Sequence, residues 1–431
     1  MTQPAIRLLA ALACLAAAAT AAASTFDESY TRGTLTMDDG LNCNFVDHMF
    51  KDEQGFVWIA TGGGGLARFD GYDVINYDIN TTPGLKSNFV HRMCTDTHGR
   101  MWVASEGGID VIDLAQNTNC RLAGNTDRIL APMHSPAHLV MRDASGNIWF
   151  AGGQLLVCIG FDSDGSVGRT SITQAAAGQQ FTTMAIIGGR TWVATEGRIF
   201  EARPDGTRIA LTPTGIDVLP QLGTVIYNIY QKDNEIWIGT SRGLARHGIN
   251  SDNSKLYVHS DTDTRSISQN FITDISEMST GQMVFATLKG LNIYDPITDT
   301  FERLAQDDSK PNSLSCNFVN CLLRDGETLW VGTEVCGIDR FTPCSLTIRN
   351  FSHSTTQPAS ISPNPVNSVI QDKDGNLWVG TVEGGLNMQP HGRQEFRHFT
   401  TDNGLIHNSV SALAIDADNR LWIGRGAAAS A

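Results

Sequence analysis

Short apolar segments alternate with polar turns along almost the whole chain, and this alternation follows one repeating phrase. Each copy has an apolar stretch, an Asp that opens a turn, and an apolar-Trp-apolar step that ends in small residues. The fullest copy is DKDGNLWVGT at Asp372–Thr381. The phrase occurs nine times at a step of roughly 45 residues, and a period of that length with short strands predicts a β-propeller with one blade per copy.

The copies are centred on one aromatic position. All eight tryptophans of the chain occupy it, and Val284 replaces Trp in one copy. The tryptophan centres are Trp58, Trp102, Trp149, Trp192, Trp237, Trp330, Trp378 and Trp422. A large ring in the middle of a strand fills the wedge between two blades and anchors them, so we expect every one of these tryptophans before Trp422 to be largely buried.

One copy is long enough for four strands. Between Gly40 and Asn80 the segments GLNCNFVDHMFKD, FVWIAT, GGGGLARFD and GYDVINYD each have the pattern of a short strand, and turn residues separate them. We interpret Gly62–Gly65 as a structural bend rather than a phosphate-binding loop, because no helix N-terminus follows it.

The start of the mature chain predicts how the ring closes. YTRGTLTMDDGL aligns with FRHFTTDNGL, which is a fourth strand and the lead into the next copy, so the strand Tyr30–Thr36 has no blade of its own. The seventh copy lacks a fourth strand, because Thr342-Pro343-Cys344 interrupts its last hairpin. We therefore expect an all-β fold with one closed seven-bladed propeller over residues 24–345. Residues 346–431 are expected to hold the first two blades of a second, incomplete propeller.

The N-terminus and the net charge limit the location and the partners. Residues 1–23 are expected to be a signal peptide, since an Arg precedes a long apolar run that ends in small residues. Cys14 leaves a lipoprotein as the alternative, although Ala11 stands where a lipid-attachment motif prefers Leu. No later stretch has the about 18 apolar residues that a spanning helix needs, so we expect a periplasmic protein without a second anchor. The net charge of −14 argues against a nucleic-acid partner.

Cysteine and histidine spacing predicts neither a disulfide framework nor a metal site. The eight cysteines beyond the signal are scattered, which indicates small buried side chains. A bridge between Cys43 and Cys316 stays open as an alternative, because both hold the same repeat position in copies that ring closure makes neighbours. His134 and His138 form the one close pair, without an acidic or Cys ligand at metal spacing. No catalytic motif is present, and neither a catalytic residue nor a cofactor is predicted.

Written as GL…N.V…D..G.LWIGT..GL.R.D…F, the repeat resembles the two-component regulator propeller, which forms the periplasmic sensor region of hybrid two-component systems in Bacteroidetes. The resemblance implies two seven-bladed propellers, a β-sandwich, a membrane helix and a histidine kinase, in a homodimeric receptor for oligosaccharides released from a polysaccharide. The chain departs from this plan because it ends in LWIGRGAAASA, inside the ninth copy. We therefore expect a truncated sensor region without the kinase and without catalytic activity.

Differences among the copies suggest a ligand face. Asn holds one position just before the first strand in six copies, namely at Asn44, Asn88, Asn270, Asn317, Asn364 and Asn408. This position favours a turn residue that bonds its own backbone. As the alternative we predict the first four as ligand contacts, because the loops at blade ends gather around the axis. Arg68, Arg246 and Arg340 recur after the Gly-Leu or Gly-Ile step of the third strand, and we interpret them as ion-pair partners on the blades.

Two functional classes stay open. The first is a non-catalytic sensor that holds a glycan by polar groups and aromatic faces. The second is a propeller enzyme, such as a polysaccharide lyase or a hydrolase-like enzyme, with an acid–base pair or a His on the axial face. A rise in melting temperature without product favours the sensor, whereas turnover favours the enzyme.

Overall fold

The computed structural model describes residues 26–216, 225–249, 253–344, 351–355, 357–363, 365–393 and 395–425. The predicted signal peptide, Cys14 and Asn364 lie outside these ranges. The chain divides into two compact units, residues 1–345 and residues 346–431. No helix of the described residues is long and apolar enough to cross a membrane.

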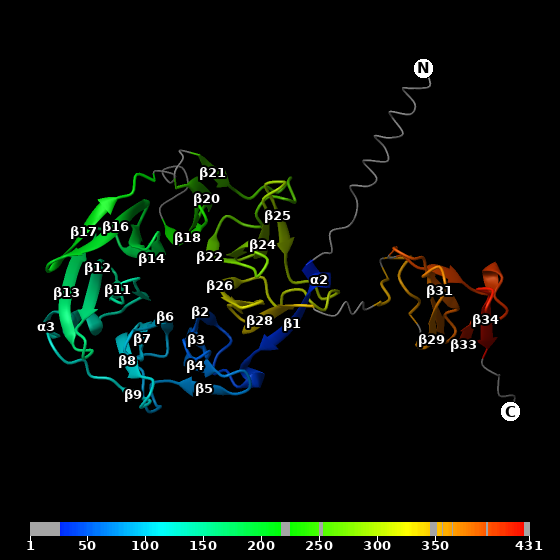
Figure 1. The fold of residues 1–431 in the computed structure, drawn as a ribbon, viewed down its shortest axis with the longest axis horizontal. Helices are drawn as coiled ribbons and strands as arrows, with labels where there is room; N and C mark the ends of the chain where they lie inside the picture. The colour runs from blue at the N-terminus through cyan, green and yellow to red at the C-terminus, as the bar shows by residue number, and fades with distance from the viewer. Residues whose placement is uncertain are drawn as a thin grey trace, which may run out of the picture. The chain divides into compact units, whose positions relative to one another are not determined.

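Strands form nearly all of the regular structure, and most of them are arranged in four-stranded antiparallel sheets (Figure 1). In the described part of unit 1, five sheets have four strands: β2 (Val46–Lys51), β3 (Val57–Thr61), β4 (Gly65–Phe69) and β5 (Val74–Tyr77); β6 (Val90–Thr95), β7 (Arg100–Ser105), β8 (Gly108–Asp113) and β9 (Thr118–Asn119); β18 (Ile226–Lys232), β19 (Glu235–Thr240), β20 (Gly243–Gly248) and β21 (Ser254–Tyr257); β22 (Ile272–Glu277), β23 (Met283–Thr287), β24 (Gly290–Asp295) and β25 (Thr300–Leu304); β26 (Val319–Asp325), β27 (Thr328–Thr333), β28 (Ile338–Pro343) and β1 (Tyr30–Leu35).

A sixth sheet of unit 1 has eight strands, in two antiparallel groups of four: β10 (Leu139–Arg142), β11 (Ile148–Gly152), β12 (Leu155–Phe161) and β13 (Val167–Gln174); β14 (Phe181–Ile187), β15 (Arg190–Thr195), β16 (Arg198–Asp205) and β17 (Arg208–Pro213). A parallel bridge between Ile172 and Arg208 joins the two groups. The described short helices are α2 (Phe26–Ser29), α3 (Asp127–Met133), η1 (Met37–Asp39) and, in unit 2, η2 (Thr401–Asn403).

The first strand of each group lies innermost. Among the described residues these strands contact one another in the order β2, β6, β10, β14, β18, β22 and β26, and β26 contacts β2 again. The groups are therefore blades around a common axis (Figure 1), and the predicted all-β propeller class is confirmed. The four strands expected between Gly40 and Asn80 are β2 to β5. Gly65 starts the third of them at φ +84°, with Tyr77 O only 2.2 Å from where a Cβ would stand, which supports its structural interpretation.

The N-terminal strand closes the ring. Strand β1 pairs antiparallel with β28, with Tyr30 opposite Pro343 and Leu35 opposite Ile338. The prediction that Tyr30–Thr36 completes the blade of Trp330 is thus confirmed. Pro343 has no amide hydrogen to donate. It stands at the end of the ladder, where the missing donor disturbs the pairing less than it would in the middle of the strand.

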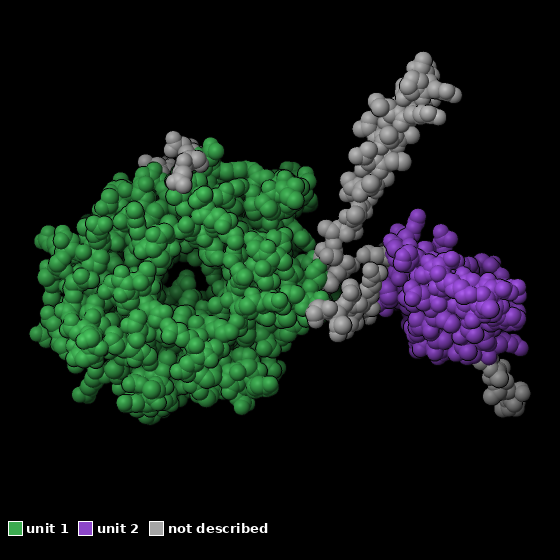
Figure 2. Space-filling model, in the orientation of Figure 1, with its two compact units in different colours: residues 1–345 green, residues 346–431 purple. Residues whose placement is uncertain are grey.

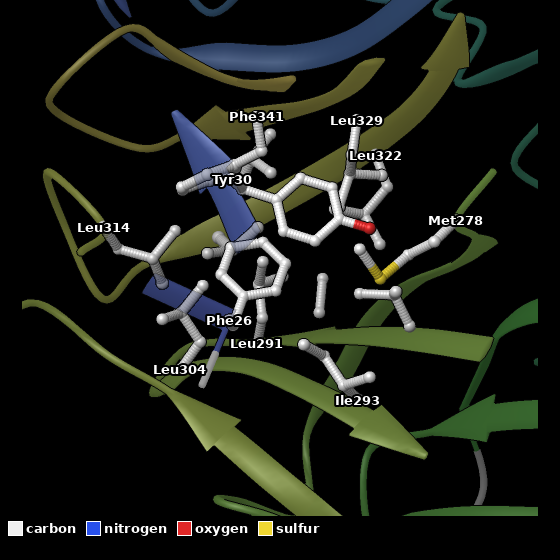
Figure 3. Packing of buried hydrophobic residues seen from close by; sticks show 14 residues of the cluster. Phe26, Tyr30, Met278, Leu291, Ile293, Leu304, Leu314, Leu322, Leu329 and Phe341 are labelled. Atoms are coloured by element: carbon white, nitrogen blue, oxygen red, sulfur yellow. The ribbon is translucent and has the colours of Figure 1, made fainter. Parts of the chain in front are cut away.

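Aromatic packing holds this closing segment in place (Figure 3). Phe26 stacks on Tyr30 with 4.4 Å between ring centroids, and its edge meets Phe341 at 5.1 Å. Leu291 and Leu304 of the preceding blade belong to the same buried cluster. The first residues of the described chain therefore bury apolar surface between two blades rather than trailing from the ring.

The Asp that recurs in the repeat forms a hydrogen bond with the Trp that recurs after it. Five copies have an Asp six residues before the Trp, and in each the carboxylate accepts the indole N–H at 2.7 to 3.0 Å: Asp52, Asp96, Asp143, Asp372 and Asp416. The other oxygen of Asp143 accepts the backbone N–H groups of Ser145 and Asn147 at 2.8 and 2.9 Å, and thereby shapes the turn. One carboxylate thus fixes both the turn and the ring.

Most of the predicted anchors are buried, with two exceptions. Trp58, Trp102, Trp149, Trp237 and Trp330 are all at most 5% exposed. Trp192 and Trp378 are half-buried, so the expectation that they are largely buried was too strong. Trp192 lies opposite Glu201, whose carboxylate pairs with the exposed Arg190.

Unit 2 has fewer strands around its tryptophans. Its described part has one four-stranded sheet and one two-stranded sheet: β29 (Val366–Gln371), β30 (Leu377–Thr381), β31 (Leu386–Gln389) and β32 (Arg397–Phe399); β33 (Val410–Ile415) and β34 (Leu421–Arg425). Trp378 contacts Phe399 within its own sheet, with 5.8 Å between ring centroids. Trp422 is 62% exposed, because no further strand of the described residues covers β34.

All eight described cysteines are free, so the open alternative of a Cys43–Cys316 bridge is not found. The two do hold equivalent positions, since the Sγ atoms accept the backbone N–H of Phe45 and of Phe318 at 3.4 and 3.3 Å. Each sulfur therefore faces its own turn rather than the neighbouring blade. Cys316 instead meets Cys336 of its own blade.

Candidate functional site

The inner strands carry a repeated irregularity near their first residue. In the described ring the pairing register shifts between Val46 and His48, Val90 and Arg92, Phe181 and Thr183, Ile226 and Asn228, Ile272 and Asp274, and Val319 and Cys321. A β-bulge of this kind changes the direction of the side chains that follow it. The sequence pattern does not reveal the bulges, because the alternation of apolar residues continues on either side of them.

The residues after the bulges contribute to a cavity. It has a volume of about 340 Å³ and lies among strands β2, β6, β10, β14 and β18, and Figure 2 shows an opening in the middle of unit 1. Its polar lining includes His48, Arg92, Arg142, Thr183 and Asn228, and the Phe50 ring adds an aromatic surface. This volume is within the range of about 300–1,000 Å³ that small-molecule sites have.

Burial and the positive charge of Arg92 shape the electrostatics of the cavity. Burial, and then the charge of Arg92, lower the pKa of His48 well below its usual value, so this imidazole is neutral at pH 7. Burial raises the pKa of Asp274, and Arg92 partly offsets that rise. In the described part of the chain the Arg92 side chain has neither an ion pair nor a hydrogen bond. The lining residues thus include two guanidinium groups, those of Arg92 and Arg142, and no carboxylate.

A second polar group lies where three blades meet. His91 of β6, Glu106 of the β7–β8 turn and His138 just before β10 come together, and one ligand atom from each lies within 4.8 Å of the others. His91 Nε2 is 3.1 Å from Glu106 Oε1, and His91 Nδ1 is 2.8 Å from Asp47 Oδ2. From the sequence, His138 was considered only with its neighbour His134, and no metal site was predicted. The structure places His138 beside His91 and Glu106 instead, and these three residues have the donor types that hold a metal ion.

The charges around His91 favour its protonated form when no ion is bound. Burial alone lowers its pKa, but hydrogen bonds and attraction to Asp47 and Glu106 outweigh burial and raise the pKa above its usual value. His138 shows the opposite direction, because burial and the nearby His91 lower its pKa.

The predicted Asn positions join consecutive blades. Asn44 Oδ1 accepts the backbone N–H of Met37 at 2.9 Å, and its backbone oxygen accepts the N–H of Gly337 from the closing blade at 3.0 Å. The amide oxygens of the other described members accept a backbone N–H in the same way, at 2.6 to 3.0 Å: Asn88, Asn270, Asn317 and Asn408. A ligand contact at the first four stays a prediction, and their amide oxygens already have a structural partner.

The recurring arginines lie across the sheet from the blade tryptophans. Arg68, Arg246 and Arg340 pair in register with the Trp of their own blade, and each guanidinium stands 5.3 to 5.8 Å from that indole ring. Arg246 also pairs with Glu235, as predicted. Within the described residues Arg68 and Arg340 have no ion pair, so for these two the interpretation was wrong, and stacking on the aromatic ring takes its place.

Comparison with known proteins identifies the repeat. The model of the two-component regulator propeller matches residues 40–63, 84–107, 313–335, 360–383 and 404–424. The extracellular domain of the hybrid two-component system BT3049 from B. thetaiotaomicron has a similar structure, with a TM-score of 0.68 and 22% identity over 92% of this chain and 52% of that chain. The extracellular domain of the hybrid two-component system BT4673 from the same organism has a TM-score of 0.55 and 16% identity, over 92% of this chain and 51% of that chain. This chain therefore spans about half the length of either domain.

Propellers of another kind also match. Virginiamycin B lyase from Staphylococcus aureus has a TM-score of 0.51 and 14% identity, over 73% of this chain and 98% of that chain. At these identities the likeness shows the propeller fold alone. A search of curated proteins found no match.

Proposed function

Two-component regulator propeller repeats recur along this chain, and we propose that it is the non-catalytic, ligand-binding part of an exported sensor in the periplasm. The ligand is an oligosaccharide released from a polysaccharide. In a longer, homodimeric receptor, the two copies have alternative arrangements relative to one another. The ligand binds one arrangement more tightly and so shifts the receptor toward it. Support comes from the repeat itself and from similar structures that are extracellular domains of two-component systems.

The axial cavity is the observation that carries the choice of ligand. Sugar hydroxyls suit side chains such as Asn228 and Thr183, and a sugar ring stacks on an aromatic face such as Phe50. The guanidinium of Arg92 makes neither an ion pair nor a hydrogen bond with the described residues, and it suits a carboxylate, which accepts two parallel hydrogen bonds from Arg. We therefore favour an acidic oligosaccharide, one that contains a uronic acid, over a neutral one.

A ligand screen with matched variants tests this proposal. Neutral and uronate-containing oligosaccharides are added to the whole chain, and melting temperature and binding heat are measured. We expect an acidic member to bind, and Arg92→Gln to weaken its Kd at least tenfold, since one charge-assisted hydrogen bond is worth about 1.5–3 kcal/mol. Arg203→Gln, which removes an exposed charge elsewhere, is the control. If no oligosaccharide binds, or if both variants bind equally well, the proposal fails.

A second candidate function has one observation in its favour. The His91 imidazole is oriented by Asp47 and lies beside Glu106 at the end of an inner strand, which is the arrangement of an acid–base pair. A propeller lyase or hydrolase-like enzyme would use it on a bound glycan. Incubation with the same oligosaccharides, followed by product analysis, separates the two: product that disappears in His91→Ala supports the enzyme, and binding without product supports the sensor.

A further inference from the structure

We propose that His91, Glu106 and His138 form a Zn²⁺ site at the joint of three blades. Two imidazoles and one carboxylate are the donor set of an open zinc site, which leaves a fourth position for water or for a ligand group. Imidazole nitrogens favour Zn²⁺ over Ca²⁺ and Mg²⁺, which prefer oxygen donors. The site is independent of the proposed sensing function, because it requires only these side chains.

The geometry is close to that of a bound ion. Two ligand atoms in a tetrahedral site with zinc bonds of about 2.0–2.2 Å lie roughly 3.3 Å apart. His91 Nε2 and Glu106 Oε1 are 3.1 Å apart, and His138 Nδ1 is 3.9 Å from the same carboxylate oxygen. The imidazole rings of His91 and His138 meet edge to face, at 4.8 Å between centroids. The three ligand atoms lie within 4.8 Å of one another, and His138 is exposed, so its side chain has room to rotate toward a shared ion.

The neighbouring blade supplies the support that zinc ligands usually have. Asp47 accepts the Nδ1–H of His91 at 2.8 Å, which leaves Nε2 as the coordinating nitrogen and fixes the plane of the ring. Asp47 and His91 both stand at the bulge of their inner strands, so the blade packing holds the pair at this distance. His138 and Glu106 are both about half exposed, with side-chain exposures of 48% and 49%, and an ion can reach them from solvent.

The alternative is a purely structural role, in which these side chains form hydrogen bonds that join the blades without any ion. It accounts for the Asp47–His91–Glu106 contacts, in which a protonated His91 bridges two carboxylates. It does not account for His138, which stands 3.9 Å from the carboxylate with its ring turned edge-on to His91. Zinc binding gives His138 a coordination bond and replaces the proton on His91 Nε2. The zinc site and the ion-free hydrogen-bond network therefore differ in whether the protein binds Zn²⁺ stoichiometrically.

Titration of the whole chain with Zn²⁺ alone tests the site. The protein is prepared without a polyhistidine tag and stripped with a chelator, and calorimetry and melting temperature are followed. We expect one Zn²⁺ per chain and a rise in melting temperature. Co²⁺ in the same place is expected to give the strong visible absorption of a four-coordinate site. Ca²⁺ is expected to give neither effect.

Four variants decide the assignment. We expect His138→Ala and Glu106→Gln to abolish stoichiometric Zn²⁺ binding, and Asp47→Ala to weaken it about 10–100-fold, as for other outer partners of metal ligands. His134→Ala removes an exposed histidine four residues away and should leave binding unchanged. Unchanged circular dichroism shows that the variants are folded. Wild-type protein that binds no Zn²⁺, or binding that persists in both His138→Ala and Glu106→Gln, overturns the proposal.

Discussion

Trp149→Phe and Trp237→Phe form a matched pair that isolates the role of the repeated Asp. Both indoles are at most 1% exposed, and both substitutions remove the same atoms. They differ in the hydrogen bond of the indole N–H: Trp149 donates it to Asp143 at 2.7 Å, whereas Gln231 stands at the equivalent position before Trp237. Phenylalanine keeps an aromatic ring at both positions, so the ring contacts that Trp237 makes with Tyr257 and Phe285 are changed less than the N–H is. The Trp237 indole N–H is buried and has no partner in the described part of the chain.

The structure sets the expected difference in stability. The cavity left by the smaller ring costs both variants a similar amount of unfolding free energy. Trp149→Phe also loses a hydrogen bond to a charged group, worth about 1.5–3 kcal/mol, whereas Trp237→Phe removes an unpaired donor and loses no such bond. The free energy of unfolding should therefore fall by at least about 1.5 kcal/mol more in Trp149→Phe than in Trp237→Phe.

Urea denaturation measures this difference. Unfolding is followed by circular dichroism rather than by fluorescence, because the substitutions change the tryptophan signal itself, and equal m-values are required for the comparison. Equal losses in the two variants, or a larger loss in Trp237→Phe, would show that the carboxylate–indole bond does not stabilise the blade.

Further predictions concern other repeated and local features. Gly290→Ala should destabilise the ring more than Gly71→Ala in urea denaturation: both residues have a positive φ, which costs a non-Gly residue about 1–2 kcal/mol, but a Cβ at Gly290 would stand 2.3 Å from a backbone oxygen and one at Gly71 would touch nothing. Asp299→Asn should lower stability at pH 7 but not near pH 2. Burial alone would raise the pKa of Asp299, yet hydrogen bonds from a lysine and two tyrosines lower it to about 2, so its contribution is present above the unfolded pKa near 4 and is lost as the pH falls through about 2. Acrylamide quenching should lose its most accessible component in Trp422→Phe and keep it in Trp58→Phe, because the two rings are 62% and 1% exposed.

The repeat pattern predicted most of the fold because its signals are local. The spacing of the tryptophans sets the blades, and the unpaired strand Tyr30–Leu35 together with Pro343 indicates how the ring closes. The carboxylate–indole bond could also have been found, since a spacing of six residues between Asp and Trp recurs in five copies. The half-burial of Trp192 could not, because Trp192 occupies the same repeat position as the fully buried Trp149 and Trp237.

Most residues of the candidate sites could not be predicted from the sequence. Asn44 and its equivalents stood out by repetition, but repetition reflected their role in joining blades. His91 and His138 belong to different copies, and only the packing of consecutive blades brings them together. Arg92 gave no signal, because the bulge that precedes it leaves no trace in the apolar pattern. Residues that act across blade joints are therefore the ones that a single repeat cannot reveal.

Closure by strand β1 has a consequence for the order in which the molecule is made. Thr31 bonds to Thr342, 311 residues later, so the first described strand of the ring must wait for β28, the last one. Such distant pairing costs chain entropy before it returns any stability, and it makes the final step of folding slow. Until then one blade edge is open and the Phe26–Tyr30 pair is uncovered. Chains are therefore most exposed to aggregation and to proteases in the interval between completing β28 and capturing β1.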